Sequence, residues 1–292
     1  MRRIGLVTEE TADLPLDIVN EYGIEIINAL LDWPEIEKLP GSNTFQKMRE
    51  LEKRGIKSFG RTSQPKPQDF LDKYEYILKE SDSVLCITLT AKLSGSHNSA
   101  ILAREMLEPN HRNRVYIVDS LSASCGQALV VLRAIDLIEN GESIEDIVKE
   151  LNTFVHKVYF YVMFEDPKWL EASGRISSFV ANLMRGMARM KVRPILKFRN
   201  GVLSPAGLKT KAEKIPEVLC RQLLRDTEKI RGEGHRIRLA ITHGDDIEGA
   251  QMLKTMAKEK FEEIEVPFIN IINNVVGAPT GPNTIALAWC EI

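Results

Sequence analysis

Hydroxyl-bearing residues follow several short apolar runs of this chain. Such hydroxyls, with the free N–H groups of a helix start, suit a small anion such as a carboxylate or phosphate. Gly95 would let the backbone approach that anion closely. The simpler interpretation is that these serines and threonines only cap helices. The groups are Thr8 after Ile4–Val7, Thr90–Ser96 after Val84–Leu89, Asp119–Ser124 with Ser120 after Val115–Val118, and Arg61–Pro65 before a helical pattern.

The sequence supports a catalytic site less well than an anion-binding site. Ser94 or Ser96 lies near His97, but neighbouring residues on a helix point in different directions. His243 follows the apolar run Ile237–Ile241 and is a better-placed base, so a serine-dependent hydrolase or transferase that uses Ser94 with His243 stays an alternative. No nucleophile elbow, Walker loop or dinucleotide-binding glycine motif occurs, which argues against nucleotide binding.

The elements that must position these residues alternate between strand and helix in the first half. Apolar positions repeat at helical spacing after Pro67, across 95–107 and after Ser143, a plausible N-cap with Asp146 three residues on. This alternation predicts a three-layer α/β/α domain with a mostly parallel sheet over residues 1–157. The turn-rich segment 29–57 is expected to be an excursion from that domain and not a core element.

The second half predicts a two-layer α/β domain with a mixed sheet over residues 158–292. Asn200-Gly201 between two apolar runs is typical of a tight type I′ hairpin. The other expected elements are strands at 158–164, 237–241 and 264–272, and helices at 176–187, 211–230 and 246–261.

Charge is unevenly distributed along the 292 residues, although 39 basic and 41 acidic side chains leave a net charge of only −2. A basic strip at 185–238 holds 15 basic and 5 acidic residues. We expect a solvated helix face first and a docking surface for an acidic protein partner second. Nucleic acid is not expected, because aromatic residues do not interleave with the charges. The strip includes Arg185, Arg189, Lys191, Arg193, Lys197, Arg199, Lys209, Lys211, Lys214, Arg221, Arg225, Lys229 and Arg231.

Cysteine spacing and hydropathy exclude other classes. The four cysteines lie far apart, which argues against a zinc site, and no metal or cofactor is expected. The N-terminus lacks the apolar stretch of a signal peptide, and no run of about 18 apolar residues could span a membrane. The sequence therefore predicts a cytoplasmic protein with reduced cysteines.

Six motifs, taken in order, resemble those of the DegV family of bacterial fatty-acid-binding proteins. They extend through the whole chain, and their order and spacing are specific although each is weak alone. The matching segments are Val7–Pro15, Thr62-Ser63-Gln64-Pro65, Leu93–Ala100, Val118–Gly126, Ser173–Ser177 with Arg175, and Arg193–Leu196 with Asn200-Gly201.

The resemblance implies two α/β domains with a long-chain fatty acid, of the palmitate, stearate or oleate class, in a buried tunnel. It implies that Thr62 and Ser94 bind the carboxylate, with the Gly95 and Ser96 backbone close by. The protein would be a non-catalytic carrier, and some relatives present the acyl group to a separate fatty acid kinase. Further residues near such a site would be Thr8, Ser120, Arg175, Pro279 and Thr280.

Two departures from the family pattern affect what the resemblance implies. The family ends in a loop whose histidine lies beside the carboxylate, and here Pro279 and Asn283 replace that histidine and the last glycine. Proline donates no hydrogen bond, so one head-group contact is lost and the link to a kinase is weakened. Glu9-Glu10 replaces the family's Asp-Ser, which places an extra acid near the first strand end.

Overall fold

A computed structural model describes residues 4–174, 186, 192–210, 214–261 and 263–292. Internal contacts divide the chain into two compact units. Unit 1 comprises residues 1–30, 63–158 and 200–202, and unit 2 comprises 31–62, 159–199 and 203–292. The domain boundary near residue 157 stays a prediction; the units divide the chain one residue later, and they group 31–62 with the second half.

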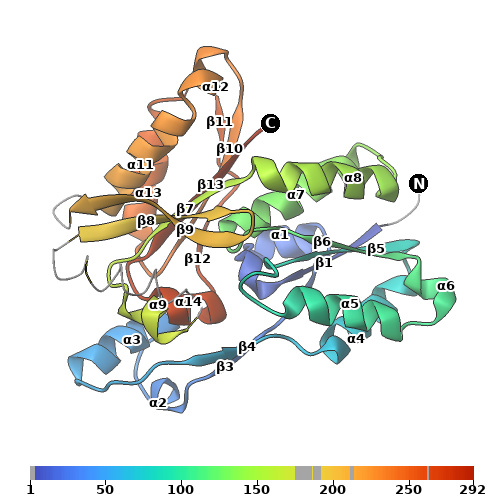
Figure 1. The fold of residues 1–292 in the computed structure, drawn as a ribbon, viewed down its shortest axis with the longest axis horizontal. Helices are drawn as coiled ribbons and strands as arrows, with labels where there is room; N and C mark the ends of the chain where they lie inside the picture. Colours follow the sequence, from blue (N-terminus) through green and yellow to red (C-terminus); the bar gives the residue numbers. More distant parts are fainter. Residues whose placement is uncertain (1–3, 175–185, 187–191, 211–213, 262) are drawn as a thin grey trace. The chain divides into compact units, whose positions relative to one another are not determined.

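Unit 1 is built on a parallel four-stranded sheet in the order β2-β1-β5-β6. Helices α4 and α5 cover one face and α7 and α8 the other, as expected for three layers (Figure 1). Every residue of β5 is buried, which explains why the strand reads as a continuous apolar run. The strands are β1 (Ile4–Glu9), β2 (Glu25–Ile27), β5 (Ser83–Thr88) and β6 (Val115–Asp119). The helices are α1 (Leu16–Glu21), α4 (Pro67–Leu78), α5 (Ser96–Met106), α6 (Pro109–Arg112), α7 (Cys125–Glu139) and α8 (Ile144–Phe154), with 3-10 turns at Glu10–Ala12 and Val155–Lys157.

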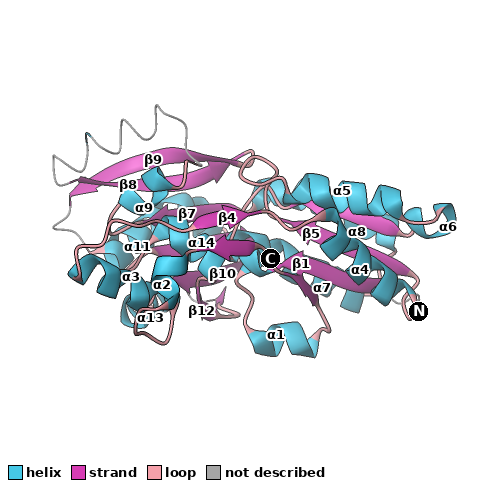
Figure 2. Cartoon of the chain, turned by 90° about the horizontal axis from the view of Figure 1, so that it is seen from below, coloured by secondary structure: helices cyan, strands magenta, loops and turns pink. Residues whose placement is uncertain are grey.

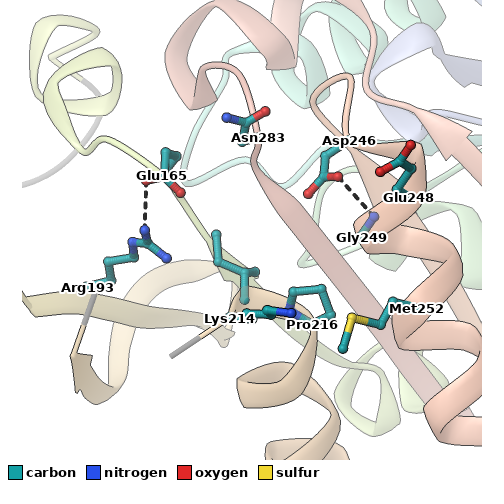
Figure 3. Close-up of a pocket in the computed structure, with 10 residues that line it drawn as sticks. Glu165, Arg193, Lys214, Pro216, Asp246, Glu248, Gly249, Met252 and Asn283 are labelled. Carbon is teal, nitrogen blue, oxygen red and sulfur yellow. Dashed lines mark hydrogen bonds and ion pairs between the residues drawn. The ribbon is translucent and has the colours of Figure 1, made fainter. Parts of the chain in front are cut away.

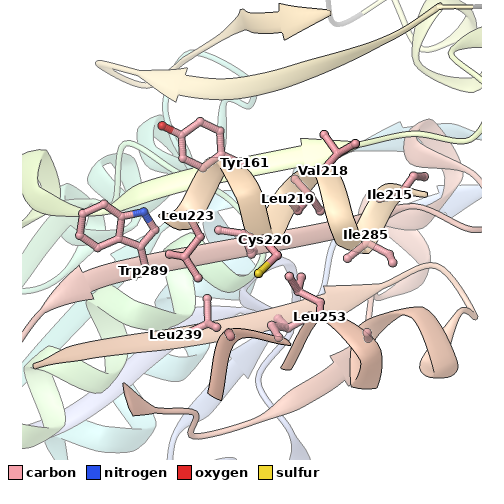
Figure 4. Packing of buried hydrophobic residues seen from close by; sticks show 14 of the residues in the cluster. Tyr161, Ile215, Val218, Leu219, Cys220, Leu223, Leu239, Leu253, Ile285 and Trp289 are labelled. Atoms are coloured by element: carbon pink, nitrogen blue, oxygen red, sulfur yellow. The ribbon is translucent and has the colours of Figure 1, made fainter. Parts of the chain in front are cut away.

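Unit 2 contains a mixed sheet in the order β11-β10-β13-β7-β8-β9, with β12 beside β10, as the sequence predicts for its fold class. Helices α11 and α13 pack on it through one apolar cluster that includes Leu219, Leu253 and Trp289 (Figure 4). The strands are β7 (Tyr159–Met163), β8 (Val192–Arg199), β9 (Val202–Thr210), β10 (Ile237–His243), β11 (Ile264–Glu265), β12 (Ile269–Ile271) and β13 (Ile285–Glu291). The helices are α2 (Pro34–Glu37), α3 (Thr44–Lys53), α9 (Lys168–Ala172), α11 (Ile215–Asp226), α12 (Glu228–Gly232), α13 (Ile247–Lys258) and α14 (Asn274–Thr280), and a two-stranded sheet joins β3 (Leu30–Asp32) to β4 (Arg61–Ser63).

The predicted hairpin and the predicted N-cap are both confirmed. Asn200 and Gly201 have φ of +48° and +78°, the left-handed values that a type I′ turn needs at both positions, between β8 and β9 (Figure 2). The Ser143 hydroxyl accepts a hydrogen bond from the Asp146 N–H at the start of α8.

The expectation that 29–57 holds no core element is wrong. Trp33, Phe45, Met48 and Leu51 are buried in a cluster with Trp169 of α9. The apolar residues of α3 recur at spacings of three, which is helical, but the surrounding prolines and glycines of the turns conceal this pattern in the sequence.

Two expected elements are interrupted. The helix expected at 211–230 stops at Thr227, whose hydroxyl donates to the Leu223 carbonyl and separates α11 from α12. The strand expected at 264–272 is divided into β11 and β12 by Pro267, which has no N–H to donate to the sheet.

The helix expected at 176–187 lies outside the described residues, Gly186 excepted.

Candidate functional site

The loops with hydroxyl groups in unit 1 leave its sheet at one edge. In the parallel register, Thr8 of β1 pairs with Ile87 of β5, and Thr88 pairs with Asp119 of β6. The segments that follow these strands therefore begin side by side, at the carboxyl ends where ligands collect in open α/β sheets.

Most of the hydroxyls at this edge are used within the unit. Thr8 is fully buried and donates its only hydrogen to the Ile87 carbonyl at 2.7 Å, while it accepts from Gln127. Ser120 donates to the Ser122 carbonyl at 3.1 Å, and Thr90 donates to the Gly201 carbonyl at 3.0 Å. These three hydroxyls use their hydrogens within unit 1 and have none to offer a ligand. None of them caps a helix start, and the place of Thr8 and Ser120 near a bound carboxylate stays a prediction.

Ser94 and Ser96 differ from the other hydroxyls. Their oxygens lie 2.8 Å apart at the start of α5, and the Ser96 N–H donates to the Ser94 oxygen at 3.2 Å. Only one hydrogen can lie between the two oxygens, so the second hydroxyl hydrogen can be donated to another acceptor. A half-buried Ser94 beside an 11-residue helix start is therefore the best anion-binding group at this edge.

Because Gly95 has no side chain, the Gln64 side chain of the same unit fits against its backbone. A Cβ atom built at Gly95 would lie 1.9 Å from the Gln64 Oε1 atom. The Gln64 amide in turn donates to the Ser99 hydroxyl of α5 at 3.1 Å. In the structure the Gln64 amide oxygen makes the close approach at Gly95, and the approach of a ligand anion to this backbone stays a prediction.

We expect Gly95→Ala to destabilise unit 1 by about 1–2 kcal/mol, because the new methyl group displaces Gln64 and breaks its bond to Ser99. Hydrogen–deuterium exchange of the α5 peptides measures the effect. The matched control is Gly95→Ala in a Gln64→Ala background, where the methyl group meets no amide. An equal loss in both backgrounds would contradict this account of Gly95.

Glu9 was noted in the sequence only as an extra acid, and the structure gives it a definite place. Its side chain is 1% exposed, and its Oε2 atom accepts a hydrogen bond from the Leu89 N–H at 2.6 Å. Burial raises the pKa of Glu9 to about 7, partly opposed by the nearby Ser96 hydroxyl and by the hydrogen bond from the Leu89 N–H. The available signal was an acid two residues after the apolar run Ile4–Val7.

The other carboxylate ligand that the resemblance implies, Thr62, lies half-buried on β4 in unit 2, whereas Ser94 belongs to unit 1. Their joint binding of one carboxylate stays a prediction. Arg175 lies outside the described residues.

The residues of the last predicted loop are engaged within unit 2. The Thr280 hydroxyl donates back to the Val276 carbonyl of α14 at 2.9 Å, and Pro279 lies inside this helix without an N–H. Asn283 has φ of +59°, a left-handed conformation that asparagine tolerates better than most residues, and accepts from Arg49 at 2.8 Å. This left-handed backbone is one that glycine also adopts readily.

His243 does not have the hydrogen-bonding pattern of a general base. Its Nδ1 atom accepts from the Asp246 N–H at 3.1 Å, so a neutral ring carries its hydrogen on Nε2 and has no free lone pair there. Burial lowers the pKa of His243, opposed by Asp246 and Asp245, which favours this neutral form. The histidine serves to shape the turn into α13.

Several members of the basic strip have partners within unit 2. Arg193 donates to Glu165 at 2.7 Å, Lys229 lies 3.7 Å from Glu233, and Arg231 donates to the Leu224 carbonyl at 2.9 Å. Arg185, Arg189, Lys191 and Lys211 lie outside the described residues. The docking surface stays a prediction. Because Arg193, Lys229 and Arg231 have partners within unit 2, fewer basic side chains are available to another protein than the sequence indicates.

A pocket of about 520 Å³ in unit 2 lies at the starts of α11 and α13 (Figure 3). Its walls carry both signs of charge, and Asp246 in one wall caps α13 through the Gly249 N–H. Such polar walls do not suit an acyl chain. Of the residues singled out in the sequence it includes Arg193, Lys214 and Asn283.

Neither a metal centre nor a membrane span is found in the part of the chain that the structure describes. Within those ranges no three histidine, cysteine or acidic side chains gather as metal ligands. The helices described there are too short or too polar to cross a membrane.

The fold and this site define a class: a two-unit α/β protein with a serine pair at the carboxyl edge of its parallel sheet. The chain belongs to the DegV family, whose model, described as covering uncharacterised proteins, matches residues 3–291. A Thermotoga maritima relative called fatty acid-binding protein is 31% identical over 97% of this chain and 96% of its own length. Protein DegV of Bacillus subtilis is 28% identical over 98% of this chain and 99% of its own.

A solved structure supports the same assignment. The DegV family protein from Thermus thermophilus, described for its fatty acid binding, matches with a TM-score of 0.81 and 28% identity over 99% of this chain and 100% of its own. The predicted family and fold class are therefore confirmed.

Proposed function

We propose that this chain binds a long-chain fatty acid of the palmitate, stearate or oleate class in a buried tunnel. Thr62 and Ser94 hold its carboxylate, with the Gly95 and Ser96 backbone nearby. The observation that carries this proposal is the whole-length similarity to a relative called fatty acid-binding protein. The spare hydroxyl hydrogen of the Ser94–Ser96 pair supports it.

The division of binding free energy follows from the ligand's chemistry. About 14 buried methylene groups at ~0.8 kcal/mol each contribute roughly 11 kcal/mol as an upper limit. Hydroxyls and helix N–H groups offer a carboxylate hydrogen bonds without a full countercharge. Affinity therefore comes from the acyl chain, and the head group sets the orientation.

In this proposal the protein is a carrier or presenter of the acyl group and not itself an enzyme. The hydrolase alternative loses support, because His243 has no lone pair free for a serine proton. Presentation to a fatty acid kinase would have to work without the family's histidine, since Pro279 offers no donor at that position.

Mass spectrometry of an organic extract tests the proposal. Protein purified from cells should release a long-chain fatty acid in about equimolar amount, and delipidated protein should take up oleate. A delipidated protein that binds no oleate would end the fatty-acid proposal.

The combined variant Thr62→Val and Ser94→Ala should bind oleate about 10–100-fold more weakly than wild type, because two hydrogen bonds to a charged group are lost while the apolar contacts remain. Displacement of a fluorescent fatty acid from delipidated protein measures the affinity. The matched control is Ser63→Ala, an exposed hydroxyl on the same strand. Unchanged affinity in the double variant would place the carboxylate elsewhere.

A further inference from the structure

Thr90 begins the turn that leads from β5 to the Ser94–Ser96 pair. It is fully buried, and its carbonyl accepts hydrogen bonds from the Leu93 N–H at 3.1 Å and the Ser94 N–H at 3.3 Å. Its hydroxyl oxygen accepts from the Lys92 N–H at 3.3 Å. Both the carbonyl and the hydroxyl of Thr90 therefore hold the backbone that carries Ser94.

The hydroxyl hydrogen of Thr90 is donated to a residue far along the chain. It bonds to the Gly201 carbonyl at 3.0 Å. Asn200 and Gly201 form the turn between β8 and β9, and internal contacts group residues 200–202 with unit 1 although they lie in the second half of the sequence. The turn of this hairpin therefore orients the Thr90 side chain.

The contact at Gly201 is close as well as hydrogen-bonded. A Cβ atom built on Gly201 would lie 2.5 Å from the Thr90 Oγ1 atom and 3.4 Å from a methyl carbon of Leu121. Gly201 also has φ of +78°, a conformation that glycine adopts readily. The buried Gly201 thus leaves no room for a side chain between the hairpin turn and Thr90.

The loop after β6 is bonded to the same turn. The Thr90 N–H donates to the Ser122 carbonyl at 3.0 Å. The Asp119 carboxylate accepts from the Ala91 N–H at 3.1 Å and from the Leu121 N–H at 2.8 Å. Leu121 has φ of +51°, a strained value for leucine that persists only where surrounding contacts over-determine the backbone. The loop and the turn therefore hold each other in one conformation, as a preorganised binding site requires.

We propose that Thr90 is a positioning residue for the head-group site, itself held by the Gly201 carbonyl. This inference rests on the proposed function and deepens it, because it names residues that place the Ser94 hydroxyl without touching the ligand. Apparent affinity falls in proportion to the fraction of molecules whose site has the binding shape. Loss of the Thr90–Gly201 bond therefore weakens binding of the carboxylate and leaves the apolar contacts of the acyl chain unchanged.

Thr90→Val tests this inference, because valine keeps the shape of the side chain and removes its hydroxyl. Displacement of a fluorescent fatty acid from delipidated protein compares oleate with methyl oleate, an ester that keeps the acyl chain but carries no charge. Wild type should bind the carboxylate more tightly than the ester. Thr90→Val should weaken oleate binding about fivefold, the effect of one neutral hydrogen bond, and methyl oleate binding by less than about twofold.

Three control variants separate positioning from general stability. Thr90→Ser keeps the hydroxyl and should retain the wild-type preference for oleate. In a Ser94→Ala background, Thr90→Val should cause almost no further loss of oleate affinity, because the hydroxyl that it positions is absent. Tyr74→Phe removes another buried hydroxyl of unit 1, which donates to the Ala100 carbonyl at 3.4 Å, and should leave the preference unchanged.

Gly201→Ala tests the same bond from its other end. The added Cβ displaces the hairpin turn from Thr90, so this variant should also weaken oleate binding selectively, and it decides alone if Thr90→Val does not fold. Equal weakening of oleate and methyl oleate would mean that the bond only stabilises unit 1. That result, or unchanged binding of both ligands, overturns the inference while leaving fatty-acid binding intact. A wild type that binds neither ligand overturns the proposed function, and this inference with it.

Discussion

The Glu9→Gln variant should be more stable than wild type by about 3 kcal/mol at pH 8 and nearly equal to it at pH 4.5. The pKa of Glu9 is about 7 in the folded chain, against an ordinary value of 4.5 that we take for the unfolded chain. Between these values the folded state binds more protons than the unfolded state. Wild-type stability is therefore present at low pH and falls as the pH rises from 4.5 through 7, by about 1.4 kcal/mol per pH unit.

Hydrogen–deuterium exchange of the β1 and β5 peptides measures the change in stability in unit 1, to which Glu9 belongs. All three tryptophans, Trp33, Trp169 and Trp289, belong to unit 2, so their fluorescence reports first on that unit, whereas Glu9 belongs to unit 1. The control is Glu75→Gln, which neutralises an exposed acid on α4 and should leave the pH profile parallel to wild type. A Glu9→Gln profile parallel to wild type would show that Glu9 keeps an ordinary pKa in the folded chain.

Sequence patterns predicted the parallel sheet of unit 1 well, because local signals and the fold agree there. The strands β1, β5 and β6 are short apolar runs with polar ends, and α8 has a serine cap and one apolar stripe. In unit 2 the sequence missed β13, which lies between β10 and β7. A strand buried on both faces has no alternation that distinguishes it from other apolar runs.

The candidate site shows a different limit of sequence reasoning. The sequence shows that a serine or threonine follows a strand, but it does not show whether the hydroxyl hydrogen is already donated within the protein. In Thr8 it is donated to a carbonyl, whereas the Ser94–Ser96 pair keeps one hydrogen available. The partners that decide this come from distant residues, such as Gln127 of α7. For the same reason, the burial of Glu9 at the end of β1, against Leu89 after β5, could not be seen in the Glu9-Glu10 pair.

Gly281→Ala should destabilise unit 2 by about 4 kcal/mol, through two effects that act together. Gly281 has φ of +81°, which strains any residue with a Cβ atom. That Cβ would also lie 2.2 Å from the Trp169 ring. The ring cannot yield, because it is 3% exposed and packs against Trp33 and Phe59, with ring centroids 6.0 and 5.3 Å away.

Gly234→Ala separates the two effects. Gly234 also belongs to unit 2 and has φ of +75°, but nothing lies within 4 Å of its added Cβ, so only the backbone strain of about 1 kcal/mol remains. Urea denaturation followed by tryptophan fluorescence compares the variants, since every tryptophan reports on unit 2. Equal losses would mean that Trp169 can move aside. A larger loss for Gly281→Ala would show that this glycine is required by packing within unit 2, whether or not a ligand is bound.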